Sequence, residues 1–132
     1  MSWRANLVAV CVLLVGLPVP VGAQLFGGIS QEQEIALGRE AATLIEEDLQ
    51  LLEDQRVHNY VDHLGQALVA RSDRADLTYV FTVVDSPEIN AFALPGGFIY
   101  VHRGLIEAAE NESELAGVLG HEIGHVVTRH GV

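Results

Sequence analysis

The chain has 132 residues, with 18 acidic against 7 basic side chains and a formal net charge of −11. This length allows one small domain, and the excess of acid argues against a nucleic acid as partner. We attribute the charge mainly to a solvated surface. The single cysteine, Cys11, lies in an N-terminal apolar run, so the rest of the chain cannot form disulfides.

Residues 1–23 have the pattern of a secretory signal peptide. Arg4 precedes an apolar run at 7–17, and small residues stand at 21–23 before Gln24. An apolar run of this length is short for a bilayer of ~30 Å, so a retained anchor is the weaker alternative. We expect cleavage after Ala23 and an exported protein whose domain occupies residues 24–132.

Two amphipathic helices are expected next. Ser30 with Gln33 forms a capping box before a helix over 31–52. Apolar residues then recur at steps of three and four, which predicts a second helix over 54–70. His58 and His63 lie on this second helix among acidic neighbours, and we expect both to face solvent.

The middle of the chain predicts a small antiparallel sheet. β-Branched and aromatic residues dominate 77–84, a second extended segment covers 90–94, and 98–101 is a strand that returns after a turn at 95–97. Pro95 is unsuited to a central strand, so the segment before it is expected at an exposed edge. The fold class is therefore α+β.

The last part predicts a short helix over 104–109 and then a longer helix capped by Asn111 with Glu114. The expected core-facing stripe of that longer helix consists of Leu115, Leu119, Ile123, Val126 and Val127. Three glycines, Gly117, Gly120 and Gly124, gather on another side of it. Either a backbone or substrate approaches them closely, or they are packing contacts.

An H-E-x-x-H string at residues 121–125 lies within this helix. His121 and His125 are four residues apart, so their rings project from consecutive turns about 40° apart and can hold one metal ion. Imidazole pairs of this kind suit zinc. Glu122 is turned aside from the metal, where it can accept a proton from the water that attacks a carbonyl.

The same string can arise by chance on a solvated helix. Here apolar residues flank it on both sides, so polar ligands enter a mostly buried helix, which favours the metal site. His102 could approach the site but has no motif to support it. His130 falls about 140° from His125 and is better suited to a role at the helix end.

Three stretches resemble the M48 family of zinc metallopeptidases, especially its exported bacterial members. They are residues 29–38 (ISQEQEIALG), 90–101 (NAFALPGGFIYV) and 114–125 (ELAGVLGHEIGH). The resemblance implies a gluzincin-like domain, one Zn²⁺ per chain held by His121 and His125, and Glu122 as catalytic base. It also implies that the edge segment Asn90, Ala91, Phe92 and Ala93 binds the substrate backbone by strand addition.

The resemblance further implies polypeptide substrates among exported or envelope proteins, at a periplasmic or membrane-associated location. It also implies a third zinc ligand, a glutamate on a helix downstream of the motif, but no acidic residue follows Glu122 here. We therefore expect this chain alone to be inactive and to leave the stripe from Leu115 to Val127 uncovered. The alternatives are a non-catalytic, chaperone-like module that binds peptides at the sheet edge and an incomplete gene product without a function of its own.

Overall fold

The computed structural model describes residues 28–129. The expected signal peptide, Cys11 and His130 lie outside these residues. The elements, in chain order, are α2 (Gln31–Glu46), α3 (Gln55–Val69), β1 (Val80–Val84), β2 (Ala91–Leu94), β3 (Phe98–His102), α4 (Arg103–Ala108) and α5 (Glu112–Val127). The α+β class expected from the sequence is confirmed.

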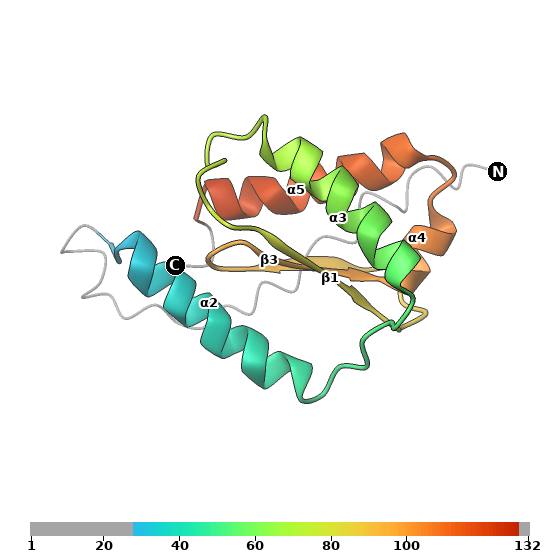
Figure 1. Ribbon diagram of the computed structural model, residues 1–132, viewed down its shortest axis with the longest axis horizontal. Helices are drawn as coiled ribbons and strands as arrows, with labels where there is room; N and C mark the ends of the chain where they lie inside the picture. Colours follow the sequence, from blue (N-terminus) through green and yellow to red (C-terminus); the bar gives the residue numbers. More distant parts are fainter. Residues whose placement is uncertain (1–27, 130–132) are drawn as a thin grey trace.

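The three strands form one sheet with helices on both faces. Helix α2 lies on one face, and α3 and α5 lie together on the other (Figure 1). The larger core fills the space between the sheet and α3 and α5, and a smaller cluster joins α2 to the opposite face. None of the helices in the described part of the chain has the length and apolar character needed to span a bilayer.

The sheet is mixed, so the expectation of an antiparallel sheet is wrong for one pair. The strand order is β1-β3-β2, with β3 antiparallel to β2 but parallel to β1. Strand β3 lies in the centre, and Ile99, Tyr100 and Val101 are all buried because helices cover both faces of the sheet there. Strand β2, which precedes Pro95, lies at an edge as predicted.

The first helix is shorter than predicted, because α2 ends at Glu46 and not near residue 52. The last turn has no basic residue, and acidic residues follow it. Their negative charge is unfavourable beside the negative end of the helix dipole, so the helix gains nothing electrostatically here. The backbone instead runs beside β1: Leu51 bridges Val84, and the Leu52 N–H donates to the Val83 carbonyl at 2.9 Å. The second helix was predicted correctly.

Helix α5 is covered by the rest of the described chain. Leu115, Leu119, Ile123 and Val126 are buried against α3 and the sheet, and Val127 is partly buried beside them. The predicted stripe is therefore confirmed, whereas the expectation that it would be left uncovered is wrong. Helix α3 and the sheet already bury it.

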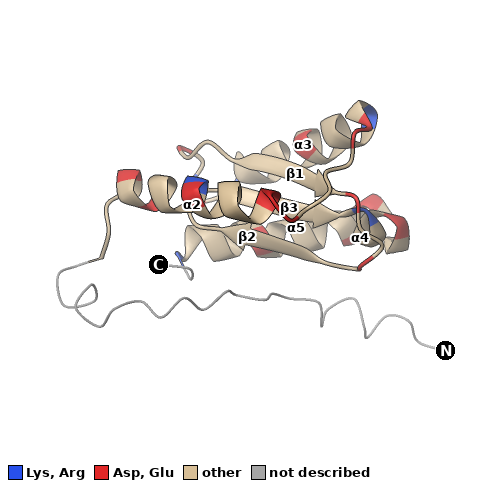
Figure 2. Cartoon of the chain, turned by 90° about the horizontal axis from the view of Figure 1, so that it is seen from below, with Lys and Arg blue, Asp and Glu red and all other residues tan. Residues whose placement is uncertain are grey.

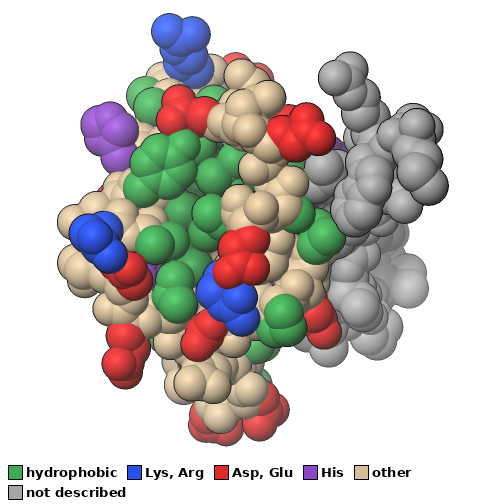
Figure 3. Space-filling view, turned by 90° about the vertical axis from the view of Figure 1, so that its right-hand side faces the viewer, with side chains coloured by type: hydrophobic (Ala, Val, Ile, Leu, Met, Phe, Trp, Pro, Cys, Tyr) green, Lys and Arg blue, Asp and Glu red, His purple; other side chains and the backbone are tan. Residues whose placement is uncertain are grey.

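Acidic residues are distributed over several helices, as the red segments of the ribbon in Figure 2 show. Figure 3 shows the end of the molecule that carries α4, where hydrophobic side chains gather between acidic ones. Among the histidines of α3, His63 is exposed as expected. His58 is not, because its ring is partly buried and hydrogen-bonds through Nε2 to the carbonyl of Leu52.

Candidate metal centre

Helix α5 begins with strong local signals. The Asn111 side chain accepts a hydrogen bond from the Glu114 N–H at 3.0 Å, and Glu112 and Glu114 place negative charge in the first turn. The buried stripe then fixes the rotation of the helix against α3 and the sheet. This leaves the side that carries His121 and the three glycines away from the core.

The two histidines of the motif converge. Their Nε2 atoms lie 3.0 Å apart, and the ring planes are inclined at 85° with centroids 4.6 Å apart. A tetrahedral zinc ion with Zn–N distances of ~2.0–2.1 Å would separate its two nitrogen ligands by about 3.3 Å. The pair of nitrogens is therefore already close to a spacing that fits one metal ion.

Glu122 lies on the buried side of the same turn. Its side chain is 0% exposed, and neither carboxylate oxygen has a hydrogen-bond partner among the described residues. Loss of hydration raises the pKa of Glu122 from 4.5 to about 7. A buried carboxylate without a partner is costly, so this geometry suits a group whose partner arrives with a metal or substrate.

The described residues do not supply a third ligand. No group of three or more His, Cys, Asp or Glu side chains between residues 28 and 129 could hold a metal ion. His102 lies on the other face of the sheet. It is two residues after Tyr100 on β3 and so shares the face of Tyr100, and its ring is 6.0 Å from Phe92. Tyr100 and Phe92 belong to the cluster that contacts α2. Burial lowers the pKa of His102, and Glu88 partly opposes this. His102 therefore does not approach the histidine pair.

The three glycines of α5 have open space beside them. A Cβ atom added at Gly117, Gly120 or Gly124 would meet nothing within 4 Å among the described residues. They are therefore not packing contacts within this part of the chain. Close approach of a substrate or of another segment remains a prediction.

The predicted substrate strand lies next to this helix. Helix α5 packs on β2, and no described strand pairs with the outer edge of β2. Within β2, Ala91 is buried in the core, while Phe92 stacks on Tyr100 at 4.9 Å. Just before it, the carbonyl of Asn90 accepts from the His102 N–H. What β2 presents at its free edge is therefore backbone.

The sequence did not reveal one set of residues near the site, Glu34, Arg74 and Arg129. Glu34 is buried on α2, where both its oxygens accept from Arg74 at 2.9 Å. Burial alone would raise the pKa of Glu34, but Arg74, Arg129 and the Gly96 N–H lower it below its usual value. The available signal was that Glu34 shares a helix face with Gly38 and Ala42, which are both small and buried.

A helix that presents two convergent imidazoles and a buried carboxylate, beside an open strand edge, is the arrangement of a metallopeptidase site. Comparison with known proteins agrees, because residues 53–132 match peptidase family M48. The chain belongs to this family of metallopeptidases.

Relatives include the β-barrel assembly-enhancing protease of Yersinia pestis, 36% identical over 110 residues, and the putative enzyme of that name from Vibrio cholerae, 34% identical over 110 residues. Each match covers 83% of this chain and 23% of the relative. The mitochondrial metalloendopeptidase OMA1 of Arabidopsis thaliana is 38% identical over 81 residues, 61% of this chain and 17% of that protein. The chain thus spans about a quarter or less of the length of these relatives.

Proposed function

We propose that this chain supplies the metal-binding helix and the substrate-binding strand of a zinc-dependent endopeptidase. The observation that carries the proposal is the pair of Nε2 atoms of His121 and His125, 3.0 Å apart, beside the buried carboxyl group of Glu122. Zinc, when bound, would act as a Lewis acid that polarises the scissile carbonyl. His121 and His125 would hold it, with further ligands from outside the described residues.

Glu122 would act as general base and then as general acid. Its carboxylate would accept a proton from the attacking water and return it to the leaving amine. In the metal-free chain burial raises the pKa of Glu122, and a carboxyl whose pKa is raised toward neutrality is suited to both accept and release a proton. Exclusion of solvent by the core maintains this pKa, since desolvation is its cause.

Strand β2 would bind the substrate by strand addition. An extended peptide can pair with the backbone groups that the segment Asn90, Ala91, Phe92 and Ala93 turns away from β3, and main-chain pairing selects for extended, unfolded segments over particular side chains. Because β2 and α5 are packed together, a peptide on this edge would pass beside the two histidines. The open side of α5 at Gly117, Gly120 and Gly124 leaves room for it.

The names of the bacterial relatives suggest where the substrates are found. They are called β-barrel assembly-enhancing proteases, which points to proteins of the bacterial envelope. We extend this to the present chain as a proposal: its substrates are unfolded or misassembled exported proteins. The signal-peptide pattern at residues 1–23 is consistent with an exported location.

The test is Glu122→Gln in the full-length protein. This change keeps both imidazoles, so Zn²⁺ binding should be retained, while cleavage of an unfolded protein such as casein should fall by ~100-fold or more. Glu40→Gln, an exposed glutamate on α2, is the matched control and should leave both properties unchanged. Undiminished cleavage by the Glu122 variant would refute the assignment.

A binding module is the second candidate, because the described residues contain only two candidate ligands and yet include an open strand edge. Such a module would bind extended peptides without zinc and without cutting them. Calorimetry with Zn²⁺ on the full-length protein separates the two candidates, because only the peptidase must bind the metal and release or absorb heat as it does so.

A further inference from the structure

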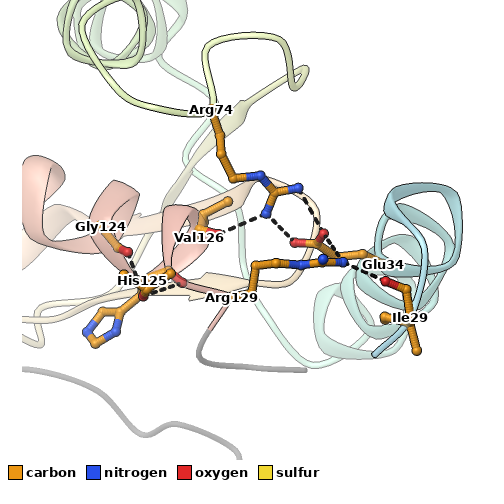
Figure 4. A network of polar contacts seen from close by, with 8 residues as sticks. Ile29, Glu34, Arg74, Gly124, His125, Val126 and Arg129 are labelled. Carbon is orange, nitrogen blue, oxygen red and sulfur yellow. Dashed lines mark hydrogen bonds and ion pairs between the residues drawn. The ribbon is translucent and has the colours of Figure 1, made fainter. Parts of the chain in front are cut away.

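A buried ionic network joins three segments that lie far apart in the sequence. Glu34, in the first turn of α2, is 1% exposed and pairs with both terminal nitrogens of Arg74 at 2.9 Å. The Arg129 guanidinium lies 3.0 Å from the second oxygen of Glu34. Figure 4 shows the two arginines converging on this carboxylate from opposite sides.

The network ends on the last turn of α5. Arg74 Nη1 also donates to the carbonyl of Val126 at 3.0 Å, the residue directly after His125. Carbonyls in the last turn of a helix lack normal intrahelical partners, and a cation there also interacts favourably with the helix dipole. Arg74 thus fixes the end of the helix that carries the second candidate ligand.

Arg129 closes the connection from the other side. It lies two residues after the end of α5 with φ of 56°, a left-handed conformation that is strained for a residue with a side chain. In this conformation its Nη2 donates to the carbonyl of Ile29 at 2.9 Å, just before α2 begins. Contacts to both Glu34 and Ile29 hold Arg129 in place.

The network also includes the turn that follows the substrate strand. The Gly96 N–H contributes to lowering the pKa of the Glu34 carboxyl, and a Cβ atom added at Gly96 would lie 2.8 Å from the Cα of Ile35. Gly96 belongs to the turn between β2 and β3. One carboxylate therefore links the turn after the substrate strand to the end of the metal-binding helix.

Stability alone is a weak reason for such a network. Desolvation of buried charges offsets much of their attraction, and well-packed apolar replacements are often at least as stable. What the charges add is a fixed relative position, since a bidentate Arg–carboxylate pair admits only one geometry. The chain uses two of its seven basic residues here, although acidic residues outnumber basic ones by 18 to 7.

We propose that Glu34, Arg74 and Arg129 are positioning residues for the metal site, which hold the last turn of α5, and with it His125, at a fixed place beside the turn after β2. The inference rests on the proposed function, because it takes His121 and His125 as the metal ligands. The three residues do not touch the metal or the substrate. They act through Val126, Ile29 and Gly96.

The test compares Glu34→Met/Arg74→Met with the wild type in the full-length protein. The two thioether chains replace the ion pair by apolar groups. Arg129 is 37% exposed and keeps its hydrogen bond to Ile29, so its charge can turn to solvent and the melting temperature should stay close to the wild-type value. The Zn²⁺ dissociation constant should nevertheless rise by ~10-fold or more, the effect typical of residues that orient metal ligands. Amides of residues 124–127 should exchange with deuterium faster, measured with a chelator present.

The matched control is Arg103→Gln, which breaks ion pairs to Asp85 and Glu107 at the other end of the molecule from the last turn of α5 (Figure 1). This variant should leave Zn²⁺ affinity and exchange at 124–127 unchanged. If it weakens Zn²⁺ binding as much as the double variant, the effect is one of general stability and the proposal is wrong. Wild-type affinity in a folded double variant also overturns it.

If the double variant does not fold, Arg129→Gln replaces it. Arg129 is 37% exposed and should tolerate substitution better than the buried pair. Unchanged Zn²⁺ affinity in the Arg129 variant overturns the proposal. If the wild type itself binds no Zn²⁺, the proposed function fails and the exchange measurement decides alone. Faster exchange confined to 124–127 then supports the part of the proposal that the network holds the last turn of α5, and unchanged exchange refutes that part as well.

Discussion

Glu122 should destabilise the metal-free protein above neutral pH, and Glu122→Gln should remove this effect. The carboxyl is fully buried without a hydrogen-bond partner among the described residues, and its pKa is raised to about 7. In the unfolded chain the same group ionises near 4.5. The unfolded state therefore releases the proton first as the pH rises, and the folded state loses stability between these two values.

The magnitude follows from the pKa difference. At ~1.4 kcal/mol per pH unit, a rise from 4.5 to about 7 corresponds to about 3 kcal/mol. The loss is absent below pH ~4, grows through the interval and is complete above pH ~8. Glutamine has nearly the same shape and no charge, so the variant should gain about 3 kcal/mol over the wild type at pH 8 and almost nothing at pH 4.

Urea unfolding of both proteins at a series of pH values, with a chelator present, measures this difference. Titrating groups distant from Glu122 are common to both proteins, so their contributions largely cancel when the curves are subtracted. A difference that stays constant between pH 4 and pH 8 would show that Glu122 is hydrated or partnered in the folded state. The desolvation argument would then be wrong.

Two more predictions concern packing. Gly38→Ala should destabilise the protein by about 3 kcal/mol or more, because the added Cβ would lie 1.7 Å from the Pro95 carbonyl oxygen. Gly117→Ala should instead stabilise it by ~0.5–1 kcal/mol, because the added Cβ meets nothing within 4 Å. Urea unfolding checks both variants, and equal effects would contradict the packing of α2 on the β2–β3 turn. Leu119→Ala should cost about 2–5 kcal/mol, because Leu119 is completely buried on the core-facing side of α5. A loss below ~1 kcal/mol by the same assay would argue against that burial.

Signals that act within a few residues allowed most of the fold to be predicted. The capping pairs Ser30–Gln33 and Asn111–Glu114 form as expected, with hydrogen bonds in both. The apolar stripe of α5 identified its buried side, and Pro95 identified the edge strand. Each of these rests on local backbone chemistry or on a helical repeat, which the sequence displays directly.

The errors concern contacts between distant residues. Leu49 and Leu52 fit a helical repeat, yet they serve as well in an extended segment that packs beside β1. The parallel pairing of β1 with β3 depends on β3 entering between two earlier strands, for which no local signal exists. The network of Glu34 escaped notice for the same reason, since its partners are 40 and 95 positions away in the sequence.

The candidate metal centre was the part most readily predicted from the sequence, because its residues are close together on one helix. Its residue types are also unusual for a buried helix. Three glycines at 117, 120 and 124 each cost about 1 kcal/mol relative to alanine, and Glu122 is buried without a partner. Local preference and fold agree along most of α5 but conflict within residues 117–125. Such conflicts persist where function requires them, and here they coincide with His121 and His125. Glu34 differs from Glu122, because its buried carboxylate is paired with Arg74 and Arg129. Its loss should therefore change the position of the metal site and not the proton transfer within it.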